Sequence, residues 1–149
     1  MQPGPPAELP GPRERLRLGY EALNRGDLSA VVALVAPDIV WESETSDAGR
    51  GRESFRRFLQ SWLDSFDGFR AEPQEVLERG QHLVAVVDLK GRGRGSGVEV
   101  AVRTTHVWTI SAGHAVRWRA YLNREAALAT IASGERLSRR AGAWSRAGD

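Results

Sequence analysis

The sequence of 149 residues contains no cysteine, which excludes disulfides, thiolate metal sites and a cysteine nucleophile. It also lacks a run of about eighteen apolar residues, the length needed to cross a bilayer as a helix. The N-terminal stretch MQPGPPAELPGP has neither the basic start nor the apolar core of a signal peptide. These absences predict a cytoplasmic protein with no membrane partner.

Histidine is scarce, and the sequence has no catalytic spacing motif. The three histidines stand at positions 82, 106 and 114, without the HxH or HExxH spacing of zinc sites. No GxSxG elbow marks a serine nucleophile. We therefore expect no metal and no cofactor, and any chemistry should be acid or base catalysis.

The charge distribution gives little support to nucleic-acid binding. The net charge is only +2, although the sequence pI is about 9.6. Nucleic-acid binding requires basic residues clustered on one face or helix, whereas here they concentrate in GRGRG and in the C-terminal tail. We predict no nucleic-acid partner.

Composition along the chain suggests one domain between two loose ends. Five of the seven prolines lie within residues 1–12, which predicts a disordered leader. Residues 133–149 are rich in Gly, Ser, Ala and Arg, which predicts a flexible tail. The folded domain should span residues 13–132, with enough of the 41% hydrophobic residues to form a core.

Helical spacing dominates the first half of this domain. Leu16, Tyr20 and Leu23 recur at i, i+4 and i+7, and Gly26 and Asp27 suit a helix end and the next helix cap. A second helix is predicted over LSAVVALVA, followed by a short strand in DIVWES. The strongest helix, over residues 51–66, has one aromatic and aliphatic face, made of Phe55, Phe58, Leu59, Trp62, Leu63 and Phe66.

Strand-like runs fill the second half, separated by the turns ERG, KGRGRGSG and SAGH. Helices followed by hairpins predict an α+β fold, with the helices packed on one face of a curved antiparallel sheet. Alternation along the strand from Gly97 places His106 on the inner face with Thr104 and Trp108, unless a bulge reverses the phase. Asp88 shares a face of its own strand with Val84.

Two side chains are candidate catalytic groups, each with a structural alternative. His106 can serve as a general base, because imidazole titrates near neutral pH, or it can be a neutral core residue. The Asp88 carboxylate can have a raised pKa beside an apolar run, or it can be solvated at a strand edge. The sequence leaves both alternatives open.

The order of these segments resembles the SnoaL-like branch of the nuclear transport factor 2 superfamily. The matching stretches are RGDLSAVVALVAPDIVW, the Gly51-Arg52 pair, GRGRGSG and HVWTISAGHAVRWRAYLNREAAL. The resemblance implies a cone in which a bent sheet wraps a long helix and leaves an apolar pocket at one end. It also implies a homodimer through the outer sheet face.

Within such a cone, the pocket would be lined by Tyr20, Trp41, Phe58, Trp62, Phe66, His106, Trp108 and Tyr121. These aromatic residues can instead simply fill the core. Arg119 shares a strand face with Tyr121 and would hold an anion in the pocket or make contacts outside it. Glu42 and Glu44 are further acid candidates near the first strand.

The function implied by the resemblance is binding of a small hydrophobic molecule. If it is an enzyme, the reaction would be a cofactor-free cyclisation or isomerisation of a polyketide-like substrate. The residue pattern of a ketosteroid isomerase or of a limonene-type epoxide hydrolase is not recognisable here. The alternative is a non-catalytic dimeric ligand-binding or adaptor protein.

Overall fold

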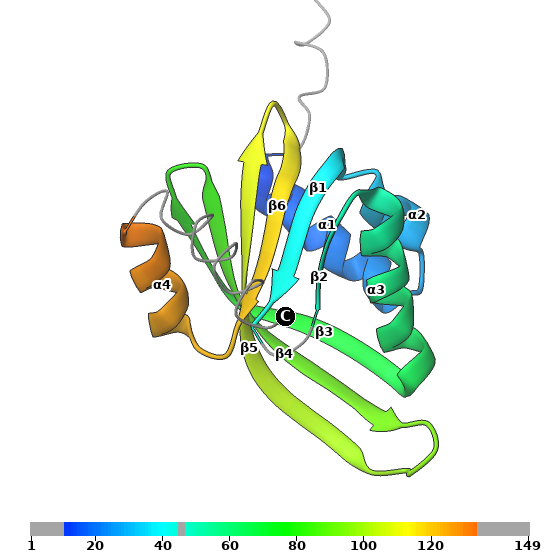
Figure 1. Ribbon diagram of the computed structural model, residues 1–149. Coiled ribbons are helices and arrows are strands. Elements are labelled where there is room, and N and C mark those ends of the chain that lie inside the picture. Colours follow the sequence, from blue (N-terminus) through cyan, green and yellow to red (C-terminus); the bar gives the residue numbers. More distant parts are fainter. Residues whose placement is uncertain (1–10, 45–46, 134–149) are drawn as a thin grey trace, which may run out of the picture.

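The protein folds as an α+β structure, described by a computed structural model over residues 11–44 and 47–133 (Figure 1). The helices are α1 (Pro12–Asn24), α2 (Leu28–Val32), α3 (Arg52–Ser65) and α4 (Arg124–Ala132). The strands are β1 (Val35–Ser43), β2 (Ala48–Arg50), β3 (Phe66–Arg79), β4 (His82–Gly93), β5 (Glu99–Ser111) and β6 (His114–Tyr121). Most of the predicted leader and tail lies outside the described residues, although α1 already begins at Pro12.

The six strands form one curved sheet in the order β2-β1-β6-β5-β4-β3. Neighbours pair antiparallel except β1 and β6, which run parallel. The sheet is therefore mixed, and the expectation of a purely antiparallel sheet is corrected at this pair. The α+β cone expected from the family resemblance is confirmed.

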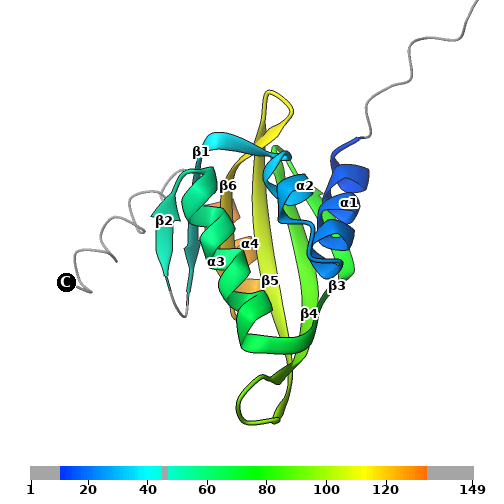
Figure 2. The same ribbon diagram turned by 90° about the vertical axis from the view of Figure 1, so that its right-hand side faces the viewer.

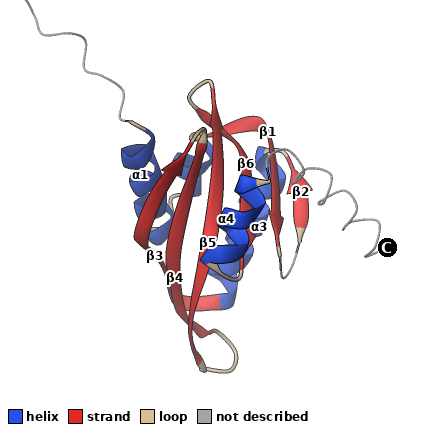
Figure 3. Cartoon of the chain, turned by 90° about the vertical axis from the view of Figure 1, so that its left-hand side faces the viewer, coloured by secondary structure: helices blue, strands red, loops and turns tan. Residues whose placement is uncertain are grey.

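The two faces of the sheet carry different helices. Helices α1, α2 and α3 cover the concave face, whereas α4 lies against the convex face of β4, β5 and β6 (Figures 2 and 3). The larger core fills the space between the concave face and the first three helices. A smaller core of Val84, Val107, Tyr121 and Ala127 lies under α4.

The corner between α1 and α2 follows the sequence signals. Gly26 adopts a φ of +79°, and the Asp27 side chain accepts a hydrogen bond of 3.1 Å from the Ala30 amide, as an N-cap residue does. The second helix is shorter than predicted, because β1 already begins at Val35. A residue before proline disfavours helical backbone, so Ala36 before Pro37 promotes this early change.

Two elements escaped the sequence prediction. Strand β2 is only three residues long, which is too short to show an alternating pattern of apolar and polar residues. Helix α4 is capped by Asn123, whose side chain accepts a hydrogen bond of 2.8 Å from the Ala126 amide.

Among the described residues, none of the helices has the length and apolar character needed to cross a membrane.

Candidate functional site

A cavity of about 330 Å³ lies on the concave side, between the helices and the β5–β6 end of the sheet. Small-molecule sites typically have volumes of roughly 300–1,000 Å³ and mainly apolar walls. The exposed residues Pro12 and Gly113 mark its mouth. The deeper walls are Leu16, Gly19, Tyr20, Leu23, Val31, Leu34, Phe55, Leu59, Leu83, His106, Trp108, Ile110, Ala115 and Trp118.

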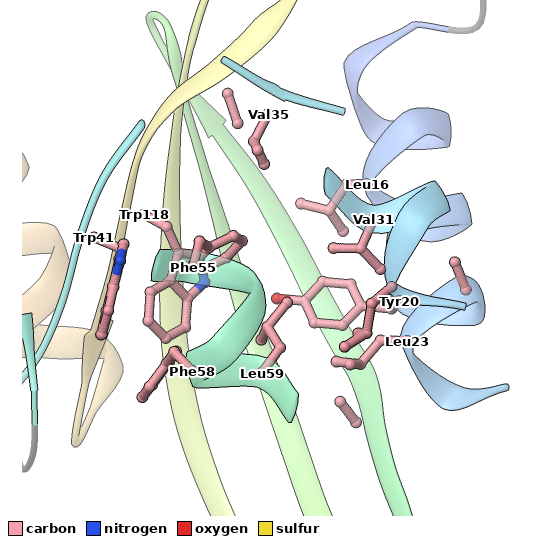
Figure 4. Close-up of a cluster of buried hydrophobic side chains, with 14 of the residues drawn as sticks. Leu16, Tyr20, Leu23, Val31, Val35, Trp41, Phe55, Phe58, Leu59 and Trp118 are labelled. Atoms are coloured by element: carbon pink, nitrogen blue, oxygen red, sulfur yellow. The ribbon is translucent and has the colours of Figure 1, made fainter. Parts of the chain in front are cut away.

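A packed aromatic cluster adjoins this cavity. The Trp118 ring, only 1% exposed, lies at its centre and is 5.6 Å from the Phe58 ring and 6.1 Å from the Trp62 ring. Trp41 stacks on Phe58 at 4.3 Å. In Figure 4, Tyr20 extends from α1 toward α3, whereas Trp41 and Phe58 lie on the other side of α3.

The predicted ligand-binding residues on the concave side therefore fall into two groups, those that line the cavity and those that do not. Tyr20 and Trp108 line the cavity together with His106. The other aromatic residues predicted for the concave side lie in or against the hydrophobic core and not on the cavity wall: Trp41, Phe58, Trp62 and Phe66.

His106 faces the helices from the middle of β5. The β4–β5 register is continuous from Glu99 to Thr109, so no bulge changes the phase of the strand before His106. The side chain is 2% exposed, and burial lowers the pKa of its imidazole to about 3, because a charged ring would lose its hydration. His106 is therefore neutral at physiological pH.

A directed hydrogen-bond chain fixes the proton positions on this neutral ring. Trp108 Nε1 donates to Tyr20 Oη at 3.1 Å, and Tyr20 Oη lies 2.7 Å from His106 Nδ1. Since indole N–H only donates, the tyrosine hydroxyl is free to donate its own proton to Nδ1. This arrangement satisfies all three groups and assigns the imidazole proton to Nε2.

The Nε2 atom of His106 is the open end of this chain. It makes no hydrogen bond to any described residue, and it is not among the polar atoms that are sealed from solvent without a partner. Because His106 lines the cavity, its Nε2–H is available to an acceptor on a bound molecule. Burial also raises the pKa of Tyr20, so its hydroxyl stays neutral.

Asp88 and Arg119 lie on the opposite, convex face of the sheet. Asp88 Oδ1 accepts a hydrogen bond of 2.7 Å from Arg103 Nε, and this bond lowers the pKa of the carboxyl. Arg119 is 2% exposed and pairs in register with Val107, the residue after His106. Alternation of side chains across a strand separates these residues from His106.

Tyr121 and both acid candidates of the first strand also lie away from the cavity. Tyr121 belongs to the core under α4. Glu42 pairs in register with Arg119, and burial raises the pKa of its carboxyl, while Arg119 and Arg117 oppose that shift. Glu44 Oε1 accepts a hydrogen bond of 2.7 Å from the Leu122 amide.

The ionisable groups on the described cavity wall are consequently Arg15, Tyr20 and His106. No carboxylate is among these wall residues, and no group of three potential metal ligands occurs within the described part of the chain. Sequence reasoning missed Arg15. Its signal was its place four residues before Gly19, on the same side of the helix and next to Leu16.

The sequence profile of the SnoaL-like domain matches residues 16–118. An NTF2-like protein of unknown function from Burkholderia pseudomallei has 24% identity and a TM-score of 0.68, with 74% of this chain and 89% of that chain covered. A putative polyketide cyclase from Sinorhizobium meliloti has 25% identity and a TM-score of 0.62, with 75% and 94% covered. No curated protein matches the sequence significantly.

A further similar structure is that of TerC co-crystallised with polyporic acid. It shares 19% identity and a TM-score of 0.66, with 74% of this chain and 90% of that chain covered. The similarity of these structures establishes the cone-shaped architecture.

Proposed function

The chain belongs to the SnoaL-like domain family, and on this basis we propose that it binds a small hydrophobic molecule in the cavity beside His106. The observation that carries this proposal is an apolar cavity of about 330 Å³ with the buried imidazole on its wall. Apolar walls supply affinity, and a few placed polar groups fix the orientation of a ligand. The polyporic acid in TerC is consistent with a small molecule in this type of cone.

We assign the polar contact to His106 Nε2–H, which would donate to a carbonyl oxygen of the ligand. The chain from Trp108 through Tyr20 to His106 holds the donor in place. A neutral intramolecular hydrogen bond contributes roughly 0.5–1.5 kcal/mol. We therefore expect a ketone to bind several times more tightly than a hydrocarbon of the same shape.

The test compares 2-acetylnaphthalene with 2-ethylnaphthalene, which lacks the carbonyl, by titration calorimetry. Wild type should prefer the ketone, and His106→Leu should lose that preference while still binding the hydrocarbon. Gly19→Leu should abolish binding of both probes, because the new side chain enters the cavity. A Cβ atom at Gly19 would lie 3.2 Å from Leu34 Cδ1, which is the end of a flexible side chain that can shift, and leucine favours a helix interior more than glycine does, so this variant should fold.

Leu18→Phe is the matched control, because Leu18 is 39% exposed on the same helix and does not line the cavity. It should leave both affinities unchanged. Failure of both probes to bind wild type, or undiminished binding to Gly19→Leu, would contradict the proposal. The protein would then fit the non-catalytic adaptor alternative.

A second candidate function is a cofactor-free cyclase or isomerase, favoured by the same donor. His106 Nε2–H is placed to stabilise an enolate oxygen, and hydrogen-bond donors at a developing oxyanion lower reaction barriers. Because no carboxylate lines the described cavity wall, solvent would take the α-proton. Deuterium exchange of the methyl group of 2-acetylnaphthalene in D₂O tests this step, and wild type should accelerate it while His106→Leu does not.

The expected homodimer remains a proposal. Helix α4 covers the convex face over parts of β4, β5 and β6, so a partner would have to contact α4 or the uncovered strands of that face. A solution mass of one protomer across the micromolar range would contradict dimerisation.

A further inference from the structure

We infer that the cavity selects an amphipathic anion, with an apolar body beside His106 and a carboxylate held by Arg15 at the mouth. This inference deepens the proposed function and rests on it. It follows from the position of Arg15, the lack of a counter-charge for it among the described residues, and the apolar character of the rest of the wall. Each point is independent of the hydrogen-bond chain at His106.

Arg15 is a half-buried residue of the cavity wall. A Cβ atom at Gly113 would lie only 3.5 Å from its Nη1 atom, so the guanidinium lies beside the β5–β6 turn. Gly113 and Pro12, both exposed, form the rim around it. The charge of Arg15 is thus placed where the cavity meets solvent.

The Arg15 side chain makes no hydrogen bond or ion pair with any residue that the structure describes. Positions three and four residues away on α1 are Gly11, Pro12, Leu18 and Gly19, none of which carries a charge. The wall residues at the β5–β6 turn are Ile110, Gly113 and Ala115, and none of them carries a carboxylate.

The other two arginines of α1 behave differently. Arg13 donates to Glu78 Oε2 at 3.0 Å and to the Val76 carbonyl at 2.9 Å. Arg17 is ion-paired with Glu14 and Glu21. Among the described parts of the chain, the acids near α1 are therefore already paired, and Arg15 retains its full donor capacity.

The position and chemistry of Arg15 define the ligand. Arg15 lies five residues before Tyr20, which is about 7.5 Å along the helix axis, so its charge lies nearer the rim than the buried hydrogen-bond chain does. An unpaired guanidinium at the edge of an apolar cavity favours a planar carboxylate, because it can donate two parallel hydrogen bonds. A molecule with an apolar ring system and one terminal carboxylate meets both conditions.

The test uses 2-naphthoate and its neutral isostere 2-naphthamide as probes, measured by titration calorimetry at pH 7 on the full chain. Wild type should bind the carboxylate about ten-fold more tightly, as expected for a charge-assisted hydrogen bond. Arg15→Met keeps much of the length of the side chain without its charge. It should lose this preference or reverse it, because the anion then leaves water without a counter-charge.

Arg56→Met is the matched control. Arg56 is exposed on α3 and does not line the cavity, so its removal changes the net charge equally but should preserve the preference. Equal affinities of the two probes for wild type, or equal losses in both variants, would overturn the anion assignment while leaving the apolar binding function intact. If neither probe binds wild type and 2-acetylnaphthalene also fails, both proposals are wrong.

Discussion

Lowering the pH from 7 to 5 should destabilise this protein through His106. Burial lowers the folded-state pKa of the imidazole to about 3, whereas its ordinary value is 6.5. Between these values the unfolded chain binds a proton that the folded chain excludes. The stability that the neutral His106 contributes is therefore fully present above pH 6.5 and is lost progressively as the pH falls toward 3.

The size of this change in stability follows from the lowered pKa of His106. Each pH unit within the window changes the free energy of unfolding by about 1.4 kcal/mol. The loss between pH 7 and pH 5 should then be about 2 kcal/mol, because the unfolded imidazole is mostly protonated at pH 5. Domains of this kind have stabilities of roughly 5–15 kcal/mol, so the change is measurable without unfolding the protein.

Urea unfolding of wild type and His106→Leu at both pH values isolates this contribution. The variant lacks the titrating group, so only wild type should lose this contribution. The free energy of unfolding of wild type minus that of the variant should therefore be about 2 kcal/mol lower at pH 5 than at pH 7. His114→Gln is the control, because His114 is exposed and its removal should leave the pH dependence of wild type unchanged. Identical pH dependence in wild type and His106→Leu would refute the assignment of a neutral, desolvated imidazole.

Three other predictions follow from single contacts. Tyr20→Phe removes the partner of both His106 Nδ1 and Trp108 Nε1, so urea unfolding should show a loss of about 1–3 kcal/mol; an unchanged midpoint would contradict the hydrogen-bond chain. Ala112 has a φ of +51° in the β5–β6 turn, and Ala112→Asn should stabilise the fold by about 1 kcal/mol, measurable as a higher melting temperature. Asp88→Asn should leave the affinity for 2-acetylnaphthalene unchanged, and a large loss would show that the convex face contributes to binding.

Alternation and helical spacing predicted the main architecture because each element buries one face. The apolar stripe of α3 includes Phe55, Phe58 and Leu59, all of which are buried. Alternation along β5 correctly turned His106 toward the helices, because the register with β4 has no bulge before it. These patterns reflect local geometry, which the sequence contains directly.

The site was harder to predict because it depends on which strands meet and in what phase. The prediction of Arg119 and Tyr121 as pocket residues required β6 to present them on the concave side. The register instead pairs them with Val107 and Thr105, whose side chains lie on the face of β5 opposite to His106. The short β2 and the helix α4 left no strong periodic signal. The cavity itself depends on residues from six elements and two connecting segments, which no local pattern brings together.

The indole nitrogen of Trp108 determines the hydrogen-bond pattern at His106. An indole N–H cannot accept a hydrogen bond, so Trp108 occupies a lone pair of the Tyr20 oxygen and leaves the hydroxyl proton for His106 Nδ1. The opposite imidazole tautomer would leave that hydroxyl proton without an acceptor among the described neighbours, a costly state in a buried site. The residue that determines what His106 offers to a ligand is thus two positions away on the same strand, and it directs the imidazole toward donating a proton in a hydrogen bond rather than abstracting one.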